Sequence, residues 1–357
     1  KGYARTHRKN AGSKAPSDIA EICRRSGMRP LLFQPFPRDA KSEVYMKLWL
    51  LTIGIFPWLH VFFSVQKGDV VFFQHPLYGN RFINQLIPFI RKKKGCRFIV
   101  IIHDLESLRR RIGSNYTKEK ERTDQLADNQ LLRQFDAVIC HNVVMKKYLV
   151  SQGFCPDKII CLELFDYLTA VKTKKKKRSD IPSIAIAGNL NPKKSGYIYK
   201  LKYPKYTLTV HLYGIEYDAS QAWSGLNYHG SFEPEELPRY LQGDFGLVWD
   251  GISVETCSGN TGEYLRYNNP HKISLYLASN MPVIVWKESA LPDFVITENL
   301  GFAVDSLDEI PERIKSLSSS EYQGMCDAVQ KEGEKLRNGY YTEKAINQAL
   351  QIIGNGS

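Results

Sequence analysis

The sequence lacks the short motifs by which many metal and redox sites are recognised. Its seven cysteines form no CxxC pair and its eight histidines form no HExxH pair, which excludes the common zinc sites. An odd number of scattered cysteines favours reduced, buried thiols over a disulfide framework. We therefore expect no protein-held metal, no resident cofactor and a cytoplasmic protein.

Long apolar runs are also scarce. The segment closest to membrane-spanning length, Leu48 to Val65, is interrupted by Gly54, Pro57 and His60, whereas a spanning helix needs about 20 predominantly apolar residues. It predicts a buried or interface-forming helical hairpin, which would suit a homo-oligomer. The alternative is a peripheral contact with the inner face of the plasma membrane. The opening residues 1–16 are polar and basic, without the apolar stretch of a signal peptide.

Charge is distributed unevenly along the 357 residues. Residues 1–178 contain 34 Lys and Arg against 15 Asp and Glu, a net +19, whereas the remainder has 15 against 22, a net −7. A basic half of this kind attracts an anionic partner such as a membrane surface, a lipid pyrophosphate or nucleic acid. For each run taken singly, a solvated face or a linker is the favoured interpretation. The runs are nearly pure Lys and Arg, which counts against nucleic acid, because single-strand binders interleave aromatic residues. They lie at Arg91–Arg97, Arg109–Arg111 and Lys172–Arg178.

Short apolar runs, separated by helical patterns, predict the fold. Such runs without alternation are typical of strands in a parallel sheet covered on both faces. The sequence therefore predicts an α/β protein with two doubly wound Rossmann-like domains facing a central cleft. Because residues 1–68 contain no strand pattern, we expect the first strand of the first domain to be missing. The runs lie at residues 69–73, 97–102, 136–140 and 158–162, then at 183–187, 208–212, 226–229, 245–249, 283–285 and 301–304.

The basic segment KTKKKKRSDIP is the clearest linker, because the strand pattern restarts directly after it. We predict an N-terminal domain over residues 1–170, a linker over 171–181 and a C-terminal domain over 182–340. Residues 341–357 are expected to form a helix that packs back on the N-terminal domain.

Polar residues follow the strands of the second half, where an open parallel sheet binds its ligands. Glycine lets the backbone approach a ligand closely, lysines and amides offer donors, and an aromatic ring offers a stacking surface for a base. The chain lacks GxGxxG and GxxxxGK[ST], so neither a dinucleotide fingerprint nor a P-loop is indicated. The pattern predicts a nucleotide diphosphate site made of Gly188, Asn189, Lys193, Lys194, Tyr228, Asp250, Asn269, Lys272 and Ser274.

Lys272 is the most informative of these positions. The stretch YNNPHKISLYLASNMPVIVW, residues 267–286, predicts a helix with Pro270 and Lys272 in its first turn, followed by an interior strand. Free N–H groups and the helix dipole favour an anion there, and a phosphate is the natural ligand. The alternative is a solvated lysine on an ordinary helix.

Several segments together resemble a known family. They are GDVVFFQHPLYGN, VIIHDLESL, IAGNL, YHGSFEPEELPRYLQGDFGLVWDG and NNPHKISLYLASNMPVIV. In order and spacing they are similar to bacterial sugar-nucleotide glycosyltransferases. This family includes β-1,6-galactofuranosyltransferases of surface polysaccharide synthesis and the glucosyltransferase that extends N-acetylglucosamine on streptococcal adhesins. The resemblance implies a GT-B fold, a UDP-sugar held by the C-terminal domain, an acceptor held by the N-terminal domain, and metal-independent transfer.

The resemblance also assigns roles to individual residues. It places the phosphate-binding lysine at Lys272, the diphosphate or sugar near Gly188 and Asn189, and the nucleotide near Tyr228. It places Ser13 and Lys14, from the segment NAGSKAPSD, at the acceptor cleft.

The sequence departs from the adhesin branch at two places. That branch has an arginine where this chain has Lys193 and Lys194, and a tyrosine where this chain has His271. These departures favour the galactofuranosyl branch.

The acceptor hydroxyl needs a general base. Asp104, which follows the strand at 97–102, is the first candidate and His103 the second. Alternatively, Asp104 caps a helix at Leu105–Arg111. His75, at the end of another strand, is expected either to bind the acceptor or to satisfy loop backbone groups. Asp250 and Glu263 are candidates for binding sugar hydroxyls.

The predicted function is transfer of a hexose, with galactofuranose favoured, from a UDP-sugar to a glycan or lipid-linked glycan. The resemblance implies inversion at the anomeric carbon. A glucosyltransferase that uses UDP-glucose to extend protein O-glycans is the alternative. Readings from other classes are an inactive sugar-nucleotide-binding scaffold and a nucleic-acid-binding protein.

Overall fold

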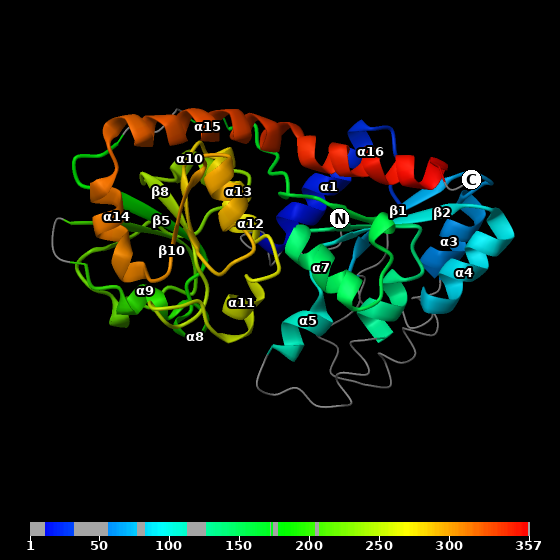
Figure 1. Cartoon of the computed structure of the whole chain (residues 1–357), viewed down its shortest axis with the longest axis horizontal. Helices are drawn as coiled ribbons and strands as arrows, with labels where there is room; N and C mark the ends of the chain where they lie inside the picture. Colours follow the sequence, from blue (N-terminus) through cyan, green and yellow to red (C-terminus); the bar gives the residue numbers. More distant parts are fainter. Residues whose placement is uncertain are drawn as a thin grey trace. The chain divides into compact units, whose positions relative to one another are not determined.

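The computed structural model describes residues 11–31, 56–76, 83–112, 126–171, 173, 178–203 and 207–355. The chain divides into two compact units (Figure 1). Unit 1 comprises residues 1–7, 20–162 and 343–357, and unit 2 comprises residues 8–19 and 163–342. The division thus falls eight residues before the expected boundary at 170. Residues 8–19, expected in the N-terminal domain, belong to unit 2 because their side chains pack on residues 166–168.

Unit 1 is built on a four-stranded parallel sheet of order β1-β2-β3-β4. The strand register is continuous from β1 to β2, with Val70 opposite Arg97 and His75 opposite Ile102. All four carboxyl ends therefore lie at one edge, as the apolar runs predicted. The strands are β1 (Val70–His75), β2 (Arg97–Ile102), β3 (Ala137–Cys140) and β4 (Ile159–Cys161).

Helices flank this sheet (Figure 1). The apolar segment predicted at Leu48–Val65 forms helix α3 from Phe56 onward, and Leu48–Ile55 lie outside the described residues. Residues 126–130 form a π-helical turn, η3, and residues 113–125 lie outside the described residues. The helices are α3 (Phe56–Ser64), α4 (Ile83–Lys94), α5 (Glu106–Arg111), η3 (Leu126–Gln130), α7 (Val143–Ser151) and η4 (Pro156–Lys158).

Unit 2 contains a six-stranded parallel sheet of order β10-β9-β8-β5-β6-β7. The chain runs outward from β5 to β7, returns to β8 on the other side of β5, and then runs outward to β10. The switch point between β5 and β8 is where ligands bind in sheets of this type. The strands are β5 (Ser183–Asn189), β6 (Thr209–Ile215), β7 (Leu226–Tyr228), β8 (Phe245–Val248), β9 (Val283–Trp286) and β10 (Gly301–Val304).

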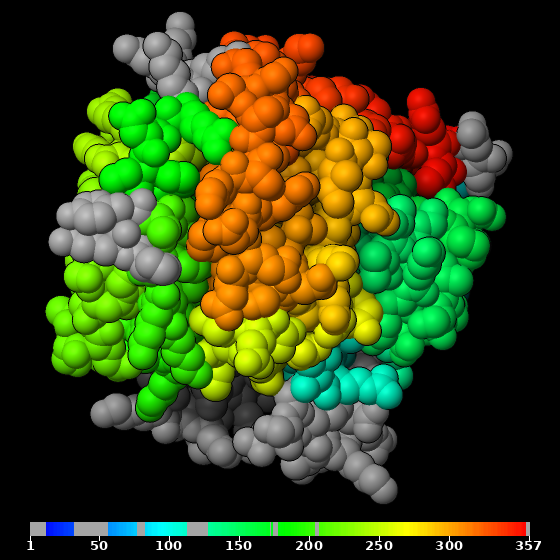
Figure 2. Space-filling model, turned by 60° about the vertical axis from the view of Figure 1, so that its left-hand side comes forward, coloured from blue at the N-terminus to red at the C-terminus, as the bar shows by residue number. Residues whose placement is uncertain are grey.

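The helices of unit 2 cover both faces of its sheet. Figure 2 views the side on which the orange helices α14 and α15 form the surface. Helix α10 begins at Leu237, because residues 234–236 form turns ahead of Pro238. The elements of unit 2 are η2 (Ala11–Ser13), α8 (Pro192–Ser195), α9 (Tyr197–Lys200), η5 (Ala219–Gln221), α10 (Leu237–Tyr240), α11 (Gly259–Tyr264), α12 (His271–Ala278), α13 (Pro292–Thr297), η6 (Leu307–Glu309), α14 (Ile310–Ser316) and α15 (Ser319–Asn338). Helix α1 (Lys14–Arg25) begins in unit 2 and continues in unit 1 from residue 20, and helix α16 (Tyr340–Asn355) belongs to unit 1 from residue 343 onward.

The predicted linker is partly anchored. Lys172 and residues 174–177 lie outside the described residues. Arg178, at the end of the basic run, donates to the carbonyl oxygens of Ile314 and Leu317 at 2.9 and 2.6 Å. Its guanidinium thus binds the carboxyl end of α14, where the helix dipole favours a cation. In the described part of the chain, no helix is long and apolar enough to cross a membrane.

Candidate active site

The side chain of Lys272 lies at the switch point of unit 2. Pro270 is the residue before α12 rather than part of its first turn, because its ψ of 135° is extended. Lys272 in the first turn donates to the carbonyl oxygen of Trp249 at 3.0 Å and to Oδ1 of Asp250 at 2.9 Å. Its side chain is 20% exposed, so the alternative of a solvated lysine is wrong.

The divergence of β5 and β8 makes room for this ammonium group. The two strands pair at Ile184 and Ala185, near the start of β5. Farther along, the N–H of Ala187 donates to the hydroxyl of Tyr276 on α12 at 2.8 Å. A helix side chain therefore satisfies the strand at the point where the pairing of β5 with β8 has ended.

Two glycines lie near the carboxyl ends of β5 and β6. Gly188 has a φ of +141°, and a Cβ there would lie 3.3 Å from Cε of Lys272. Gly214, at the end of β6, has a φ of +153°, and a Cβ there would lie 1.7 Å from the carbonyl oxygen of Gly188. Both positions therefore require glycine. The bare backbone at Gly188 lets the side chain of Lys272 lie close to the end of β5, and the role of Gly188 in ligand binding stays a prediction.

Tyr228 carries a stacked aromatic surface on the same sheet edge. Its ring stacks on that of Tyr217 at 4.3 Å between centroids, and Tyr217 stacks in turn on Tyr199 at 6.2 Å. The Tyr228 hydroxyl donates to the carbonyl oxygen of Gly214 at 2.9 Å, which fixes the ring beside the backbone of Gly214. The Tyr228 side chain is exposed, so one ring face can take a base.

The loop after β5 is held by its own amides. Asn189 Oδ1 accepts from the N–H of Asn191, and the side chain of Asn191 caps α8 by accepting from Lys193 N. Lys193 and Lys194 are exposed. The structure thus keeps two lysines on a capped turn at the carboxyl edge, and it uses the side chain of Asn189 to shape that turn.

The structure also shows the surroundings of three other predicted site residues. Asn269 is buried and donates through Nδ2 to the carbonyl oxygen of Glu163 at 2.6 Å. Ser274 is buried within α12. Glu263 forms an ion pair with Arg266 at 2.8 Å. The amide of Asn269 is thus used within the protein rather than offered to a ligand, which speaks against its predicted role in binding the nucleotide sugar. The hydroxyl of Ser274 is buried without a hydrogen-bond partner among the described residues, and its role stays a prediction.

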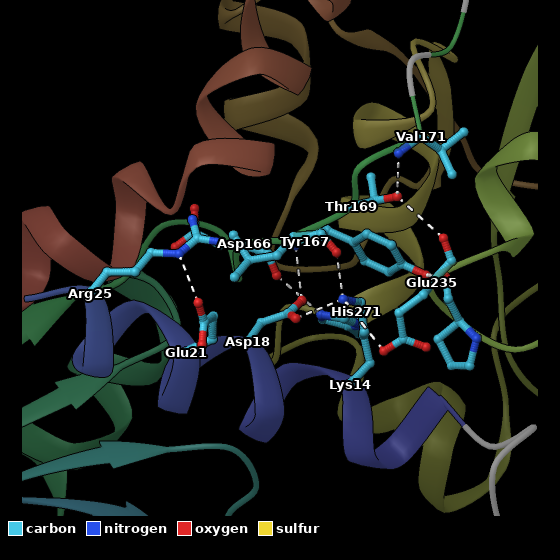
Figure 3. A network of polar contacts seen from close by, with 12 residues as sticks. Lys14, Asp18, Glu21, Arg25, Asp166, Tyr167, Thr169, Val171, Glu235 and His271 are labelled. Carbon is cyan, nitrogen blue, oxygen red and sulfur yellow. Dashed lines mark hydrogen bonds and ion pairs between the residues drawn. The ribbon is translucent and has the colours of Figure 1, made fainter. Parts of the chain in front are cut away.

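Lys14 also differs from its predicted role (Figure 3). Its ammonium group is buried and donates to Asp18 Oδ1 at 2.6 Å and to the carbonyl oxygen of Leu168 at 2.5 Å. It also lies 4.9 Å from the ring centroid of Tyr167. Lys14 therefore stabilises unit 2 from within. Its neighbour Ser13, in η2, is half-buried.

Burial controls the titration of the same network (Figure 3). It raises the pKa of Asp18 to about 6, against the lowering effect of Lys14. Burial lowers the pKa of His271 to about 4. The His271 ring stacks on Tyr167 at 5.2 Å and approaches the carbonyl oxygen of Asp166 at 3.3 Å. The His271 side chain thus contacts Tyr167 and Asp166, whereas the side chain of its neighbour Lys272 contacts Trp249 and Asp250.

In unit 1, Asp104 follows the carboxyl end of β2. The capping alternative is wrong. Helix α5 begins at Glu106, and its N-cap residue is Leu105, whose side chain makes no capping hydrogen bond. Burial raises the pKa of Asp104 to about 6, although Arg109 at 3.8 Å opposes the rise. The carboxyl group is 36% exposed. A half-buried carboxyl with a pKa near neutrality suits a general base.

Asp128 organises the surroundings of Asp104, and the sequence reasoning missed it. Its Oδ1 lies 2.9 Å from Nε2 of His75, and its Oδ2 accepts from the N–H of Ser107 at 2.6 Å. Asp128 therefore fixes both the end of β1 and the start of α5. His75 is buried and its partner is the carboxylate of Asp128 rather than the loop backbone groups expected in the alternative. Because Asp128 is 53 and 21 residues from its partners, no local spacing could reveal it.

His103, the second candidate base, is also engaged. Its Nε2 lies 2.7 Å from Oε1 of Gln74 on β1, so that nitrogen carries the proton in the bond. The structure thus favours Asp104 over His103 at this edge. In the described ranges, no three His, Cys, Asp or Glu side chains lie together as a metal-binding group.

Known proteins share sequence similarity with this chain over most of its length. Residues 3–164 match the model of the Glucosyltransferase 3-like N-terminal domain, and residues 184–349 match that of the C-terminal domain. The β-1,6-galactofuranosyltransferase WbbI of Escherichia coli K12 is 33% identical over 295 residues, which cover 81% of this chain and 82% of WbbI. Glucosyltransferase 3 of Streptococcus gordonii is 28% identical over 344 residues, which cover 95% and 94% of the two chains.

One solved structure extends the comparison to the fold. Anabaena HepE, determined in complex with UDP-glucose, matches with a TM-score of 0.57 at 11% identity, over 99% of this chain and 96% of HepE. At this identity the match concerns the fold alone. It confirms the predicted GT-B fold with two Rossmann-like domains.

Proposed function

The chain is a hexosyltransferase of the GT-B fold that belongs to the Glucosyltransferase 3-like family, and from that premise we propose that its donor is a UDP-sugar bound by unit 2. The acceptor in this proposal is a glycan or lipid-linked glycan bound by unit 1. The solved relative by fold, HepE, was determined with UDP-glucose, which supports a nucleotide-sugar donor.

The position of Lys272 carries the proposal. Its ammonium group lies at the β5–β8 switch point, above the backbone of Gly188 and in the first turn of α12. An ammonium has three donors, and two of them meet Trp249 and Asp250. The third can bind a phosphate oxygen, and the N–H groups at the start of α12 add to the positive potential.

The chemistry requires a positive charge at this point. When the glycosidic bond breaks, the leaving UDP gains negative charge on its terminal phosphate. Fixed donors that await this charge stabilise the transition state more than the ground state. In the proposal Lys272 provides this stabilisation, the backbone at Gly188 lets the diphosphate approach, and Tyr228 stacks on the uracil.

The proposal assigns the base to unit 1. Asp104 has its pKa raised to about 6 and keeps a third of its carboxyl surface exposed. In the deprotonated form it can accept the proton of the attacking acceptor hydroxyl. Its ion pair with Arg109 holds the carboxylate in place, and Asp128 holds the start of the neighbouring helix.

The donor sugar in the proposal is galactofuranose, transferred with inversion. The support is the 33% identity to WbbI, which is named a β-1,6-galactofuranosyltransferase. The competing candidate is glucose, because Glucosyltransferase 3 of Streptococcus gordonii matches a larger share of the chain at 28% identity.

Calorimetry tests the donor site. We would titrate UDP, UDP-galactofuranose, UDP-glucose and UDP-galactopyranose into the full chain in the presence of EDTA. The same titrations would follow with Lys272→Ala and with Lys315→Ala, which removes an exposed lysine from α14. We expect UDP binding that weakens by about 1–3 kcal/mol in Lys272→Ala, the scale of a charge-assisted contact, and is unchanged in Lys315→Ala.

The sugar ranking and product analysis complete the test. The UDP-sugar that binds most tightly identifies the donor, and NMR of its transfer product reports the anomeric configuration. UDP binding without turnover on any glycan acceptor would favour the inactive scaffold. If no nucleotide binds, the donor-site proposal is wrong.

A further inference from the structure

Helix α3 of unit 1 is apolar on two opposite faces. Trp58 and Val61 are buried, and Trp58 stacks on Phe73 of β1 at 6.3 Å. The opposite stripe consists of Phe56, Leu59 and Phe63, spaced at i, i+3 and i+7, and it is exposed. Phe63 is 75% exposed and Phe56 is 65% exposed. An apolar stripe that stays exposed on a helix already packed by its other face indicates a surface for another partner.

The neighbouring helix α4 extends this exposed stripe. Ile83, Ile87 and Ile90 form its buried face. Phe89, on the outer side, is 50% exposed and stacks on Phe62 of α3 at 5.8 Å. The two helices therefore share one outer apolar surface, which we call the α3–α4 surface and define by Phe56, Leu59, Phe63 and Phe89.

A basic rim adjoins the α3–α4 surface. Helix α4 ends in the run Arg91–Lys94, and neither α3 nor α4 contains an Asp or Glu. Arg91 is neutralised by Asp136 at 3.1 Å. Lys94 lies 4.6 Å from the ring centroid of Phe62, which brings its ammonium directly to the apolar surface.

Two lysines of the rim remain exposed, Lys92 and Lys93. The acidic residue nearest in sequence after α3 is Asp69, whose carboxylate accepts from the N–H of Gln66. The rim thus keeps a net positive charge beside exposed phenylalanines. Aromatic side chains flanked by lysines are the composition by which peripheral proteins enter the headgroup region of a bilayer.

We propose that the α3–α4 surface docks unit 1 on a bilayer that contains anionic lipids. Phe56, Phe63 and Phe89 would enter the boundary between headgroups and acyl chains, and Lys92 and Lys93 would bind lipid phosphates. The charge of the rim argues against a second copy of this chain as the occupant, since a two-fold interface would bring like-charged rims together. This proposal does not rest on the donor site, because lipid binding requires no catalysis.

Vesicle flotation tests the proposal with the full chain and without nucleotide. The probes are vesicles of phosphatidylcholine alone and of phosphatidylcholine with 30% phosphatidylglycerol, about the anionic content needed for a strong surface potential. The variants are F56S/F63S and K92Q/K93Q. The matched controls are Ile296→Ser, an exposed apolar residue of α13, and K315Q/K331Q, two exposed lysines of unit 2.

We expect the wild type and both controls to float with the anionic vesicles and to stay in solution with phosphatidylcholine alone. K92Q/K93Q should lower the partition constant about 30-fold, since each surface lysine contributes about a fivefold factor. F56S/F63S should lower it at least about tenfold, and raising the salt to about 1 M should release the wild type. Thermal unfolding at wild-type temperatures in each variant verifies the fold.

Four results would overturn the proposal. The first is no flotation of the wild type with anionic vesicles. The second is equal flotation of F56S/F63S and the wild type. The third is sedimentation of the wild type as a dimer that F56S/F63S converts to a monomer, without vesicle binding, which would assign the surface to a second copy. Binding to an oligonucleotide but not to vesicles would likewise assign the basic rim to nucleic acid.

Discussion

The ammonium nitrogen of Lys272 lies 2.9 Å from Oδ1 of Asp250, and both side chains are largely buried. Removing one partner leaves the other charge without compensation in a crevice of low dielectric. We expect Lys272→Ala and Asp250→Ala each to lower the free energy of unfolding by about 1–3 kcal/mol. The double variant should lose less than the sum of the two, as measured by urea unfolding.

The exposed pair of Lys287 and Asp305 provides the control cycle. These side chains lie 2.7 Å apart on the surface of unit 2, where an ion pair contributes little. Strictly additive losses for Lys272 and Asp250 would show that the two groups do not depend on each other.

Gly214→Ala should destabilise unit 2 through a backbone collision. The new Cβ would lie 1.7 Å from the carbonyl oxygen of Gly188, whereas Gly230, also at positive φ, has open space around it. Both alanine variants carry the strain of a left-handed backbone. We expect Gly214→Ala to cost about 1–3 kcal/mol more than Gly230→Ala, the scale of overpacking. Equal thermal midpoints in the two variants would contradict this contact.

The activity should depend on the protonation of Asp104. A general base must be deprotonated, and the pKa of Asp104 is raised to about 6. The rate should therefore rise as the pH increases through about 6 and be lost below it. Asp104→Asn should lower kcat by about 10²–10⁴-fold and abolish this limb of the pH profile. Asp157→Asn, at a position in η4 of the same unit, serves as the control and should keep the wild-type kcat and the wild-type pH profile.

Asp128→Ala should destabilise unit 1, because it leaves two buried donors without their acceptor. These are Nε2 of His75 and the N–H of Ser107. We expect a loss of about 1–3 kcal/mol for each buried group left unsatisfied. Asp128→Asn retains one oxygen acceptor and should lose less. If urea unfolding shows the two variants to be equally stable, the carboxylate does not bridge β1 and α5.

His141 should make unit 1 sensitive to acid. It is buried beside the carbonyl oxygen of Ile102, and burial lowers its pKa to about 4. Because the unfolded chain binds the proton at a pKa near 6.5, stability is present above pH 6.5 and is lost as the pH falls toward 4. The unfolding midpoint of His141→Asn should therefore fall less steeply over this interval than that of the wild type. Parallel slopes would exclude this role.

The sheets could be predicted from the sequence because each strand is a local apolar run. The run at 97–102 coincides with β2, and the one at 301–304 coincides with β10. Lys272 could be predicted for a related reason, since a helix start is a local feature with a known chemistry. Its partners Trp249 and Asp250 follow β8, so the sheet order brought them within reach.

The contacts that could not be predicted from the sequence are those between segments far apart along the chain. Asp128 reaches β1 and α5 across chain separations that depend on the folded sheet. Asn269 has the residue type expected of a ligand-binding loop, but its amide binds the backbone of Glu163. A polar residue after a strand can face the ligand or the protein, and only the packing around it decides which.

The placement of Lys14 has a consequence for the order of folding. Its main-chain partner, Leu168, lies 154 residues farther along the chain, with the whole sheet of unit 1 between them. On the ribosome, the strands of unit 1 can therefore pair before residues 8–19 have the segment at 166–168 to pack against. Unit 2 reaches its final packing only after its own later residues have emerged and the early segment has joined them. Cutting the chain at 163 would thus leave both units incomplete, because unit 2 would lose residues 8–19 and unit 1 would lose residues 343–357.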